Sequence, residues 1–177
     1  MKKITKYIPT IILTLLCSCS DYLDIVPDNV TTLDIVFNNR NTAERYLANC
    51  YHFVPDHGSV KRIPGMGAGH ECWFYTTNDS HFDNEVSFYI ARGLQNIDAP
   101  YANYWDGEGG SNLPMFRAIR ECNIFLDYVR DQHKVNDLTD SERKRWIAEV
   151  NVLKAYYHFF LFEHYGPIPI VDKALPV

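Results

Sequence analysis

Two stretches of the sequence, residues 70–84 and 101–106, mix aromatic side chains with amides and carboxylates. Sugar rings have apolar faces that stack on aromatic side chains, while their hydroxyl groups form hydrogen bonds with polar groups in the same wall. The pattern is therefore typical of a saccharide-binding surface. The competing explanation, which we expect to hold for most of these rings, is that they fix an irregular segment onto the rest of the fold. The candidate ligand contacts are Trp73, Tyr75, Asn78, Asp79, Tyr104 and Trp105.

Patterns that perform catalysis or bind metals are incomplete in this sequence. His70 and Glu71 begin like a zinc-protease motif, but the second histidine position is occupied by Phe74. The alternating glycines at 65, 67 and 69 lack the strand and helix that flank a dinucleotide-binding loop. No Gly-x-Ser-x-Gly elbow is present, and no nucleophile is paired with a base. We therefore expect a non-enzymatic protein with no catalytic residue, metal or cofactor.

The first residues have the pattern of an export signal. Three lysines precede an apolar run, residues 8–16, that is too short to span a bilayer as a helix, so residues 1–18 are predicted to be a signal peptide. Ser18 before Cys19 fits a bacterial lipobox, whereas the bulky Leu16 disfavours Cys17. We therefore predict lipidation at Cys19, which would attach the protein to a membrane without a spanning helix.

The charge of the chain excludes one class of partner. Residues 1–18 carry three lysines and no acidic residue, so their removal changes the formal net charge from −5 to −8. An acidic chain without a basic stripe is unsuited to nucleic acid. The cysteines beyond the lipobox are Cys50, Cys72 and Cys122, and no C-x-x-C spacing indicates a disulfide framework or a zinc site. Cys50 and Cys122 lie on apolar helix faces, where we expect buried thiols.

Helical spacing of apolar residues defines the elements that would position these side chains. Residues 55–111 interrupt the pattern with many glycines, prolines and aromatic residues, and we expect an ordered excursion with one short strand or helix near residues 86–92. The last two helices should pack antiparallel across a short loop. The predicted helices are a turn at 32–37, a helix restarted at Asn41 that ends near 53, a helix at 113–130, and a helix between the capping box at Thr139 and the stop at Gly166.

Four segments in this order resemble the SusD/RagB family of outer-membrane lipoproteins. They are Asp-Tyr-Leu-Asp-Ile-Val-Pro at 21–27, the stretch 32–47 with Phe-Asn-Asn-Arg-Asn-Thr-Ala-Glu, Ala-Ile-Arg-Glu-Cys-Asn-Ile-Phe-Leu at 118–126, and the stretch 148–171, which ends in Tyr-Gly-Pro-Ile-Pro-Ile-Val. The resemblance implies an all-α fold of tetratricopeptide-like helical hairpins with a long, irregular, aromatic-rich loop. Residues 19–31 would be a lipidated extended tether and 32–177 the N-terminal part of a SusD-like domain, incomplete at its C-terminus.

The resemblance also implies a function. Family members capture oligosaccharides, or in some cases peptides, at the cell surface and deliver them to a SusC-type TonB-dependent transporter in the outer membrane, without catalysis. Aspartates shortly after Cys19 resemble a signal for export to the outer face of that membrane. The alternative is a helical-repeat module that binds another protein, which would present contiguous exposed apolar helix faces. A surface enzyme is disfavoured by the missing catalytic residues.

Overall fold

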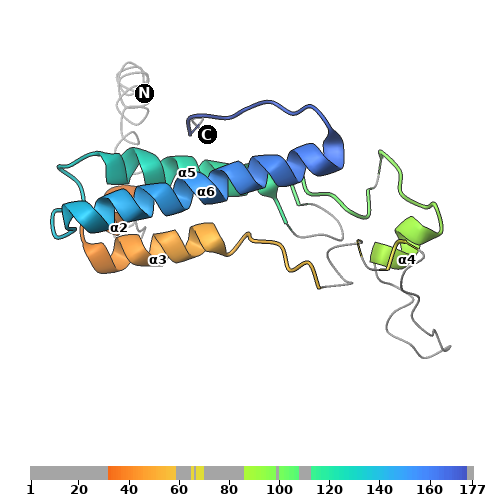
Figure 1. The fold of residues 1–177 in the computed structure, drawn as a ribbon, viewed down its shortest axis with the longest axis horizontal. Coiled ribbons are helices and arrows are strands. Elements are labelled where there is room, and N and C mark those ends of the chain that lie inside the picture. Colours follow the sequence, from red (N-terminus) through yellow and green to blue (C-terminus); the bar gives the residue numbers. More distant parts are fainter. Residues whose placement is uncertain are drawn as a thin grey trace, which may run out of the picture. The chain divides into compact units, whose positions relative to one another are not determined.

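The computed structural model describes residues 32–58, 65, 67–69, 86–98, 100–107 and 113–174. These residues form helices and no strand, which confirms the all-α prediction (Figure 1). All the contacts below lie within one compact unit, Asp34–Val177. The helices are α2 (Leu33–Val36), α3 (Arg40–Tyr51), α4 (Val86–Ala91), α5 (Met115–Arg130) and α6 (Asp140–Tyr165).

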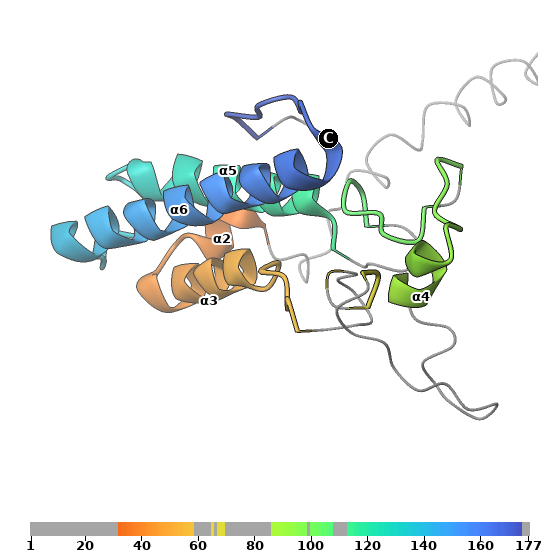
Figure 2. The ribbon, with the colours of Figure 1, turned by 45° about the vertical axis from the view of Figure 1, so that its right-hand side comes forward.

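The two longest helices, α5 and α6, lie side by side and run antiparallel, as predicted (Figures 1 and 2). Their facing sides are apolar because buried residues recur at steps of three and four along both helices. Each large side chain that is fully buried in this way contributes roughly 1.5–3 kcal/mol to folding. The largest of them in this pair are Trp146, Tyr157, Phe125 and Phe160.

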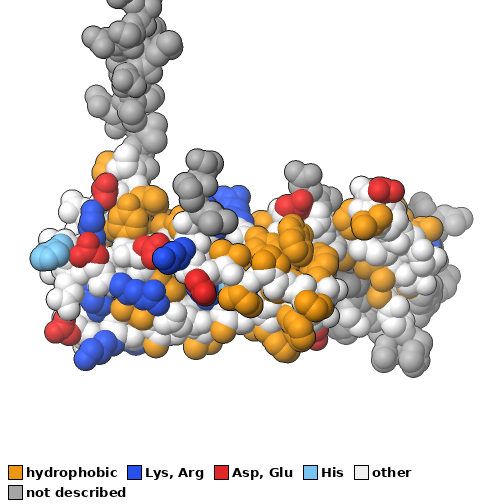
Figure 3. Space-filling view, turned by 90° about the horizontal axis from the view of Figure 1, so that it is seen from above, with side chains coloured by type: hydrophobic (Ala, Val, Ile, Leu, Met, Phe, Trp, Pro, Cys, Tyr) orange, Lys and Arg blue, Asp and Glu red, His pale blue; other side chains and the backbone are white. Residues whose placement is uncertain are grey.

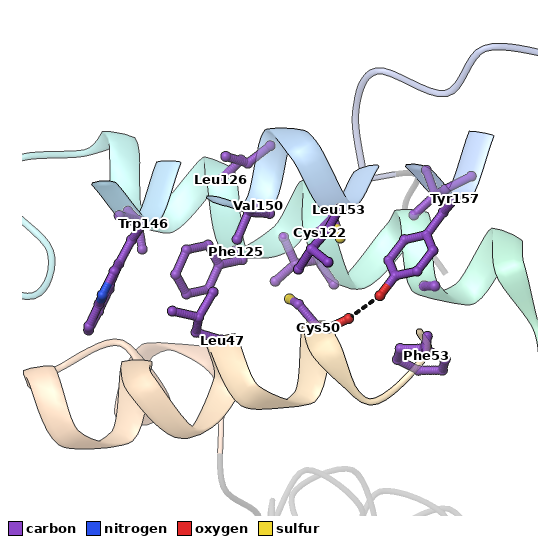
Figure 4. Close-up of a cluster of buried hydrophobic side chains, with 14 of the residues drawn as sticks. Leu47, Cys50, Phe53, Cys122, Phe125, Leu126, Trp146, Val150, Leu153 and Tyr157 are labelled. Atoms are coloured by element: carbon purple, nitrogen blue, oxygen red, sulfur yellow. Dashed lines mark hydrogen bonds between the residues drawn. The ribbon is translucent and has the colours of Figure 1, made fainter. Parts of the chain in front are cut away.

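Helix α3 completes the core by packing against both α5 and α6 (Figure 4). Ala43, Leu47 and Cys50 are its buried residues, and the Tyr157 hydroxyl of α6 donates to the carbonyl oxygen of Cys50 at 2.5 Å. The helix begins earlier than predicted. Asn39, not Asn41, is the N-cap, because its side-chain oxygen accepts the backbone N–H of Thr42 at 3.1 Å.

The connection between α5 and α6 is held by a buried arginine. The guanidinium of Arg143 donates to four carbonyl oxygens around the C-terminus of α5, where helix carbonyls lack internal partners and the helix dipole favours a cation. The predicted capping box is present: the Thr139 hydroxyl accepts the N–H of Glu142, and the Glu142 carboxylate accepts the N–H of Thr139. The four acceptors of Arg143 are the carbonyls of Val129, Asp131, Lys134 and Val135, at 2.6–3.2 Å.

The segment after α6 returns along the α5–α6 pair (Figure 1). Gly166 ends α6 with a φ of +75°, a backbone conformation that glycine adopts without strain. Val171 is then fixed from two helices: the amide of Asn123 donates to its carbonyl oxygen at 3.1 Å, and its N–H lies 3.2 Å from Nε2 of His158. The amide nitrogen of the buried Asn123 thus fixes the returning segment to α5.

The outer side of α6 is also apolar. Its hydrophobic residues are not confined to the buried stripe, and Figure 3 shows hydrophobic side chains gathered over the C-terminal half of this helix. Val152, Phe159 and Phe162 are more than half exposed, at 69%, 59% and 55%. An apolar helix face of this kind is typical of a surface that another polypeptide covers. Among the helices that the structure describes, none combines the length and apolarity needed to cross a bilayer.

Candidate functional site

The segment 101–107, which contains the predicted ligand-contact stretch 101–106, is fixed to the N-terminus of α5. The N–H of Met115, the first residue of α5, donates to the carbonyl oxygen of Tyr104 at 2.9 Å. Gly107 has a φ of +80°, and a Cβ at this position would lie 2.8 Å from the ring and the nitrogen of Pro114. Only glycine therefore allows the chain to turn at this distance from the start of α5.

Tyr104 fixes the same segment to α6. Its ring is buried, with an edge-to-face contact to Phe160 at 5.0 Å between centroids and another to His164 at 4.8 Å. Its backbone N–H donates to the hydroxyl of Tyr165, the last residue of α6, at 2.8 Å. The side chain of Tyr104 is therefore part of the core, as expected for most aromatic residues of the excursion, and it positions its neighbour in the chain.

Trp105, the next residue, faces outward. Its side chain is 43% exposed, and its ring contacts Phe116 of α5 at 4.5 Å between centroids. The ring of Tyr165 packs nearly perpendicular to it, at 85° and 5.7 Å. Helices α5 and α6 thus each supply an aromatic ring that supports Trp105, which leaves part of the indole available for a ligand.

Trp105 and Tyr165 border a hollow of about 560 Å³. Three amide residues, Gln95, Asn96 and Asn103, line the same hollow, and among the described lining residues there is no carboxylate or cation. Two of these amides also hold the loop backbone in place. The side-chain oxygen of Gln95 accepts the N–H of Tyr101 at 2.8 Å, and the side-chain oxygen of Asn103 accepts the N–H of Trp105 at 3.1 Å. The remaining lining residues are Ile97, Pro100 and Ala102.

The polar groups of this hollow are neutral. Burial raises the pKa of the Tyr165 hydroxyl above that of free tyrosine, so this hydroxyl remains protonated at physiological pH. Across the described part of the chain, no group of histidine, cysteine or acidic residues could hold a metal ion. The arrangement is suited to reversible binding of a neutral, hydroxyl-rich molecule with an apolar face.

Of the six predicted ligand contacts, the structure describes two, Tyr104 and Trp105. Tyr104 and Trp105 are adjacent in the chain but point to opposite sides, the first into the core and the second to the surface. Sequence reasoning did not identify Tyr165, Gln95 or Asn96. The available signal for Tyr165 was its place directly before the helix stop at Gly166. Cys19, Trp73, Tyr75, Asn78 and Asp79 lie outside the described residues.

An exposed indole beside amide side chains on a helical scaffold is typical of a ligand-binding protein. The chain belongs to the SusD-like family: residues 21–176 match the family SusD-like_3, described as "Starch-binding associating with outer membrane". This match confirms the resemblance to SusD/RagB proteins that the four sequence segments indicated. No curated protein and no solved structure matches the chain.

Proposed function

We propose that this protein is a cell-surface lipoprotein that binds oligosaccharides and delivers them to a SusC-type TonB-dependent transporter, without catalysing a reaction. Membership of a family of starch-binding, outer-membrane-associated proteins supports the general class. The observation that carries the proposal is the exposed Trp105 ring, supported by Tyr165 and bordered by a hollow lined with amides. Oligosaccharides are the expected ligand and peptides the alternative.

In the proposed binding mode, a sugar ring lies with its apolar face against the indole of Trp105. The hydroxyl groups at the edge of that ring meet Gln95, Asn96 and Asn103, whose amides both donate and accept hydrogen bonds. Tyr104 has a positioning role, because its backbone is fixed by Tyr165 and its ring is buried. Further contacts are proposed from the other aromatic stretch, at Trp73, Tyr75, Asn78 and Asp79.

Native electrophoresis through gels that contain soluble starch, glycogen or other polysaccharides tests this binding. The full chain is expected to migrate more slowly in at least one polysaccharide gel than in a plain gel. The matched variants are Trp105→Ala, which should migrate normally, and Phe159→Ala, which removes an exposed aromatic ring that does not line the hollow. Equal retardation of all three proteins would contradict a site at Trp105.

The proposed organisation of the chain is a signal peptide at residues 1–18, an extended tether at 19–31 and a helical domain from 32 onward. The lipid on Cys19 would hold the domain on the outer membrane, facing outward. Replacing Cys19 with Ala is expected to shift the protein from the membrane fraction to the soluble fraction. Protease added to intact cells tests the orientation, because a surface-exposed domain is digested and a periplasmic one is protected.

The transporter partnership has its own test. A tagged copy of the full chain, solubilised with its membrane in mild detergent, is expected to co-purify with a TonB-dependent barrel in a fixed ratio. Cys19→Ala serves as the matched control, since loss of the anchor lowers the concentration of the protein at the membrane. Purification of the protein without any barrel under these conditions would contradict the delivery role.

A second candidate function is supported by the outer face of α6. Val152, Phe159 and Phe162 expose a contiguous apolar stripe, which is the feature expected of a helical module that binds another protein. The variant Phe159→Glu/Phe162→Glu separates the two functions. If saccharide capture is the main role, polysaccharide binding persists in this variant. If protein binding is the main role, no polysaccharide retards the wild-type protein, and the variant loses its membrane partner.

A further inference from the structure

A second hollow, of about 310 Å³, lies between α5 and the segment that follows α6. Its surface is almost entirely apolar, and it is lined by Phe116, by Val171 and by the side chains of three basic residues, Arg117, Arg120 and Lys173. Because the surface is apolar, the carbon stems of the basic residues form the wall and their charged ends reach its rim. None of the described residues that line it is acidic. Phe116 is also the ring that contacts Trp105, so one aromatic contact joins the lining of this basic hollow to the lining of the neutral hollow described above.

The cations of the basic hollow have no acidic partners among the residues that the structure describes. In the described part of the chain, none of Arg117, Arg120 and Lys173 forms an ion pair. Arg117 also lines a separate hollow together with Asp106, whereas two other neighbouring carboxylates contact groups outside the basic hollow. Glu121 accepts a hydrogen bond from Tyr46 of α3, and Asp172 lies 3.5 Å from the ammonium of Lys154 on α6.

The backbone adds to this positive charge. Arg117 lies in the first turn of α5, where a helix carries partial positive charge and cations are disfavoured, and Arg120 lies in the second turn. No acidic residue occupies that first turn, and the N-cap, Pro114, provides no side-chain acceptor. Two arginines at this end, in a chain whose net charge is −5, are therefore not explained by helix stability or by overall charge.

We infer that the basic hollow is a subsite for an acidic sugar, so that the preferred ligand is an oligosaccharide containing a uronic acid. This inference rests on the proposed function. One sugar ring lies at Trp105, and the carboxylate of a neighbouring unit meets the guanidinium groups of Arg117 and Arg120, whose planar forks match a carboxylate. The apolar face of that acidic unit lies against Phe116 and Val171.

The test compares uronate-containing oligosaccharides with the same chains after chemical reduction of their carboxyl groups. Oligogalacturonate, oligoalginate and glucuronoxylan fragments are titrated calorimetrically into the full chain. At least one acidic ligand is expected to bind roughly tenfold more tightly than its reduced counterpart. The preference should shrink at about 0.5 M salt, because partly exposed charge pairs are screened.

Two variants then test which residues cause the preference for the acidic ligand. Arg117→Gln/Arg120→Gln should bind the acidic and reduced ligands equally. Arg130→Gln, at the opposite end of the same helix, is the matched control and should keep the preference. A preference that survives in Arg117→Gln/Arg120→Gln overturns the site.

The inference and the proposed function can fail separately. If every reduced ligand binds as tightly as its acidic form, and Trp105→Ala abolishes that binding, the acidic subsite is overturned and the saccharide-binding function stands. If neither acidic nor neutral oligosaccharides bind, both are overturned.

Discussion

The hydroxyl of Tyr165 accepts the backbone N–H of Tyr104 at 2.8 Å and so connects the last residue of α6 to the segment that carries Trp105. Replacing Tyr165 with Phe keeps the ring but leaves this N–H without its partner. We expect the free energy of unfolding to fall by about 1 kcal/mol and the affinity for the oligosaccharide to fall several-fold. Thermal denaturation and calorimetry measure the two effects.

The matched control for this change is Tyr156→Phe. It removes another hydroxyl from the same helix, one that lies 2.7 Å from His57 and does not line the hollow. A similar loss of stability without a loss of affinity is expected for the control. Equal affinity losses in both variants would show that the Tyr165–Tyr104 contact has no specific role in positioning Trp105.

The buried guanidinium of Arg143 is expected to make a large contribution to stability. In Arg143→Met, four carbonyl oxygens at the α5–α6 connection lose their donor, and the unfolding free energy should fall by about 3 kcal/mol. Arg143→Lys keeps the charge but cannot reach all four carbonyls, so an intermediate loss is expected. Urea denaturation checks both variants, and a change below roughly 0.5 kcal/mol in Arg143→Met, the range of an ordinary surface substitution, would contradict the capping role.

Acid should weaken the N-terminus of α6. Hydrogen bonds from Thr139, and then from Arg40, hold the pKa of Glu142 below its usual value of 4.5. A carboxyl group whose pKa is lower in the folded state stabilises the protein above the unfolded pKa, and this contribution disappears as the pH falls through the folded value. Glu142→Gln should therefore destabilise the protein at pH 7 and have a smaller effect at pH 3. Denaturation curves at the two pH values test this, and an equal effect at both would contradict it.

The two core cysteines should be chemically inert in the folded protein. A thiol–thiol contact with Cys122, reinforced by burial, raises the pKa of Cys50 well above its ordinary value, and both side chains are fully buried. Because the thiolate is the reactive form, neither residue should react with iodoacetamide at pH 8 until denaturant is added. Peptide mapping by mass spectrometry measures this. Rapid modification of either cysteine in native buffer would contradict the packing shown in Figure 4.

The sequence predicted the helices most accurately where a local chemical signal sets their ends. The capping box at Thr139 and the glycine at 166 fix α6 at both ends through contacts within a few residues. The predicted start of α3 was two residues too late, because Asn39 and Asn41 are both residue types that cap helices well. The choice between them depends on which side chain reaches the N–H of Thr42.

The contacts that build the site depend on the tertiary fold, and spacing alone could not reveal them. Tyr104 and Trp105 have the same type of side chain and the same local context, yet one is buried against α6 and the other is exposed. Tyr165 joins the site across a separation of 61 residues. Arg143 was similarly missed, since a charged residue near the start of an amphipathic helix ordinarily faces solvent.

The central claim, that Trp105 is the platform of a saccharide site, is tested most directly by calorimetric titration of the full chain and its Trp105→Ala variant. The ligands are maltoheptaose, chosen because the family is described as starch-binding, and the reduced and acidic oligosaccharides above. We predict that at least one ligand binds the wild type and that its affinity falls at least roughly tenfold in Trp105→Ala, while the melting temperature changes little. Equal affinity of both proteins for every ligand that binds would contradict the claim.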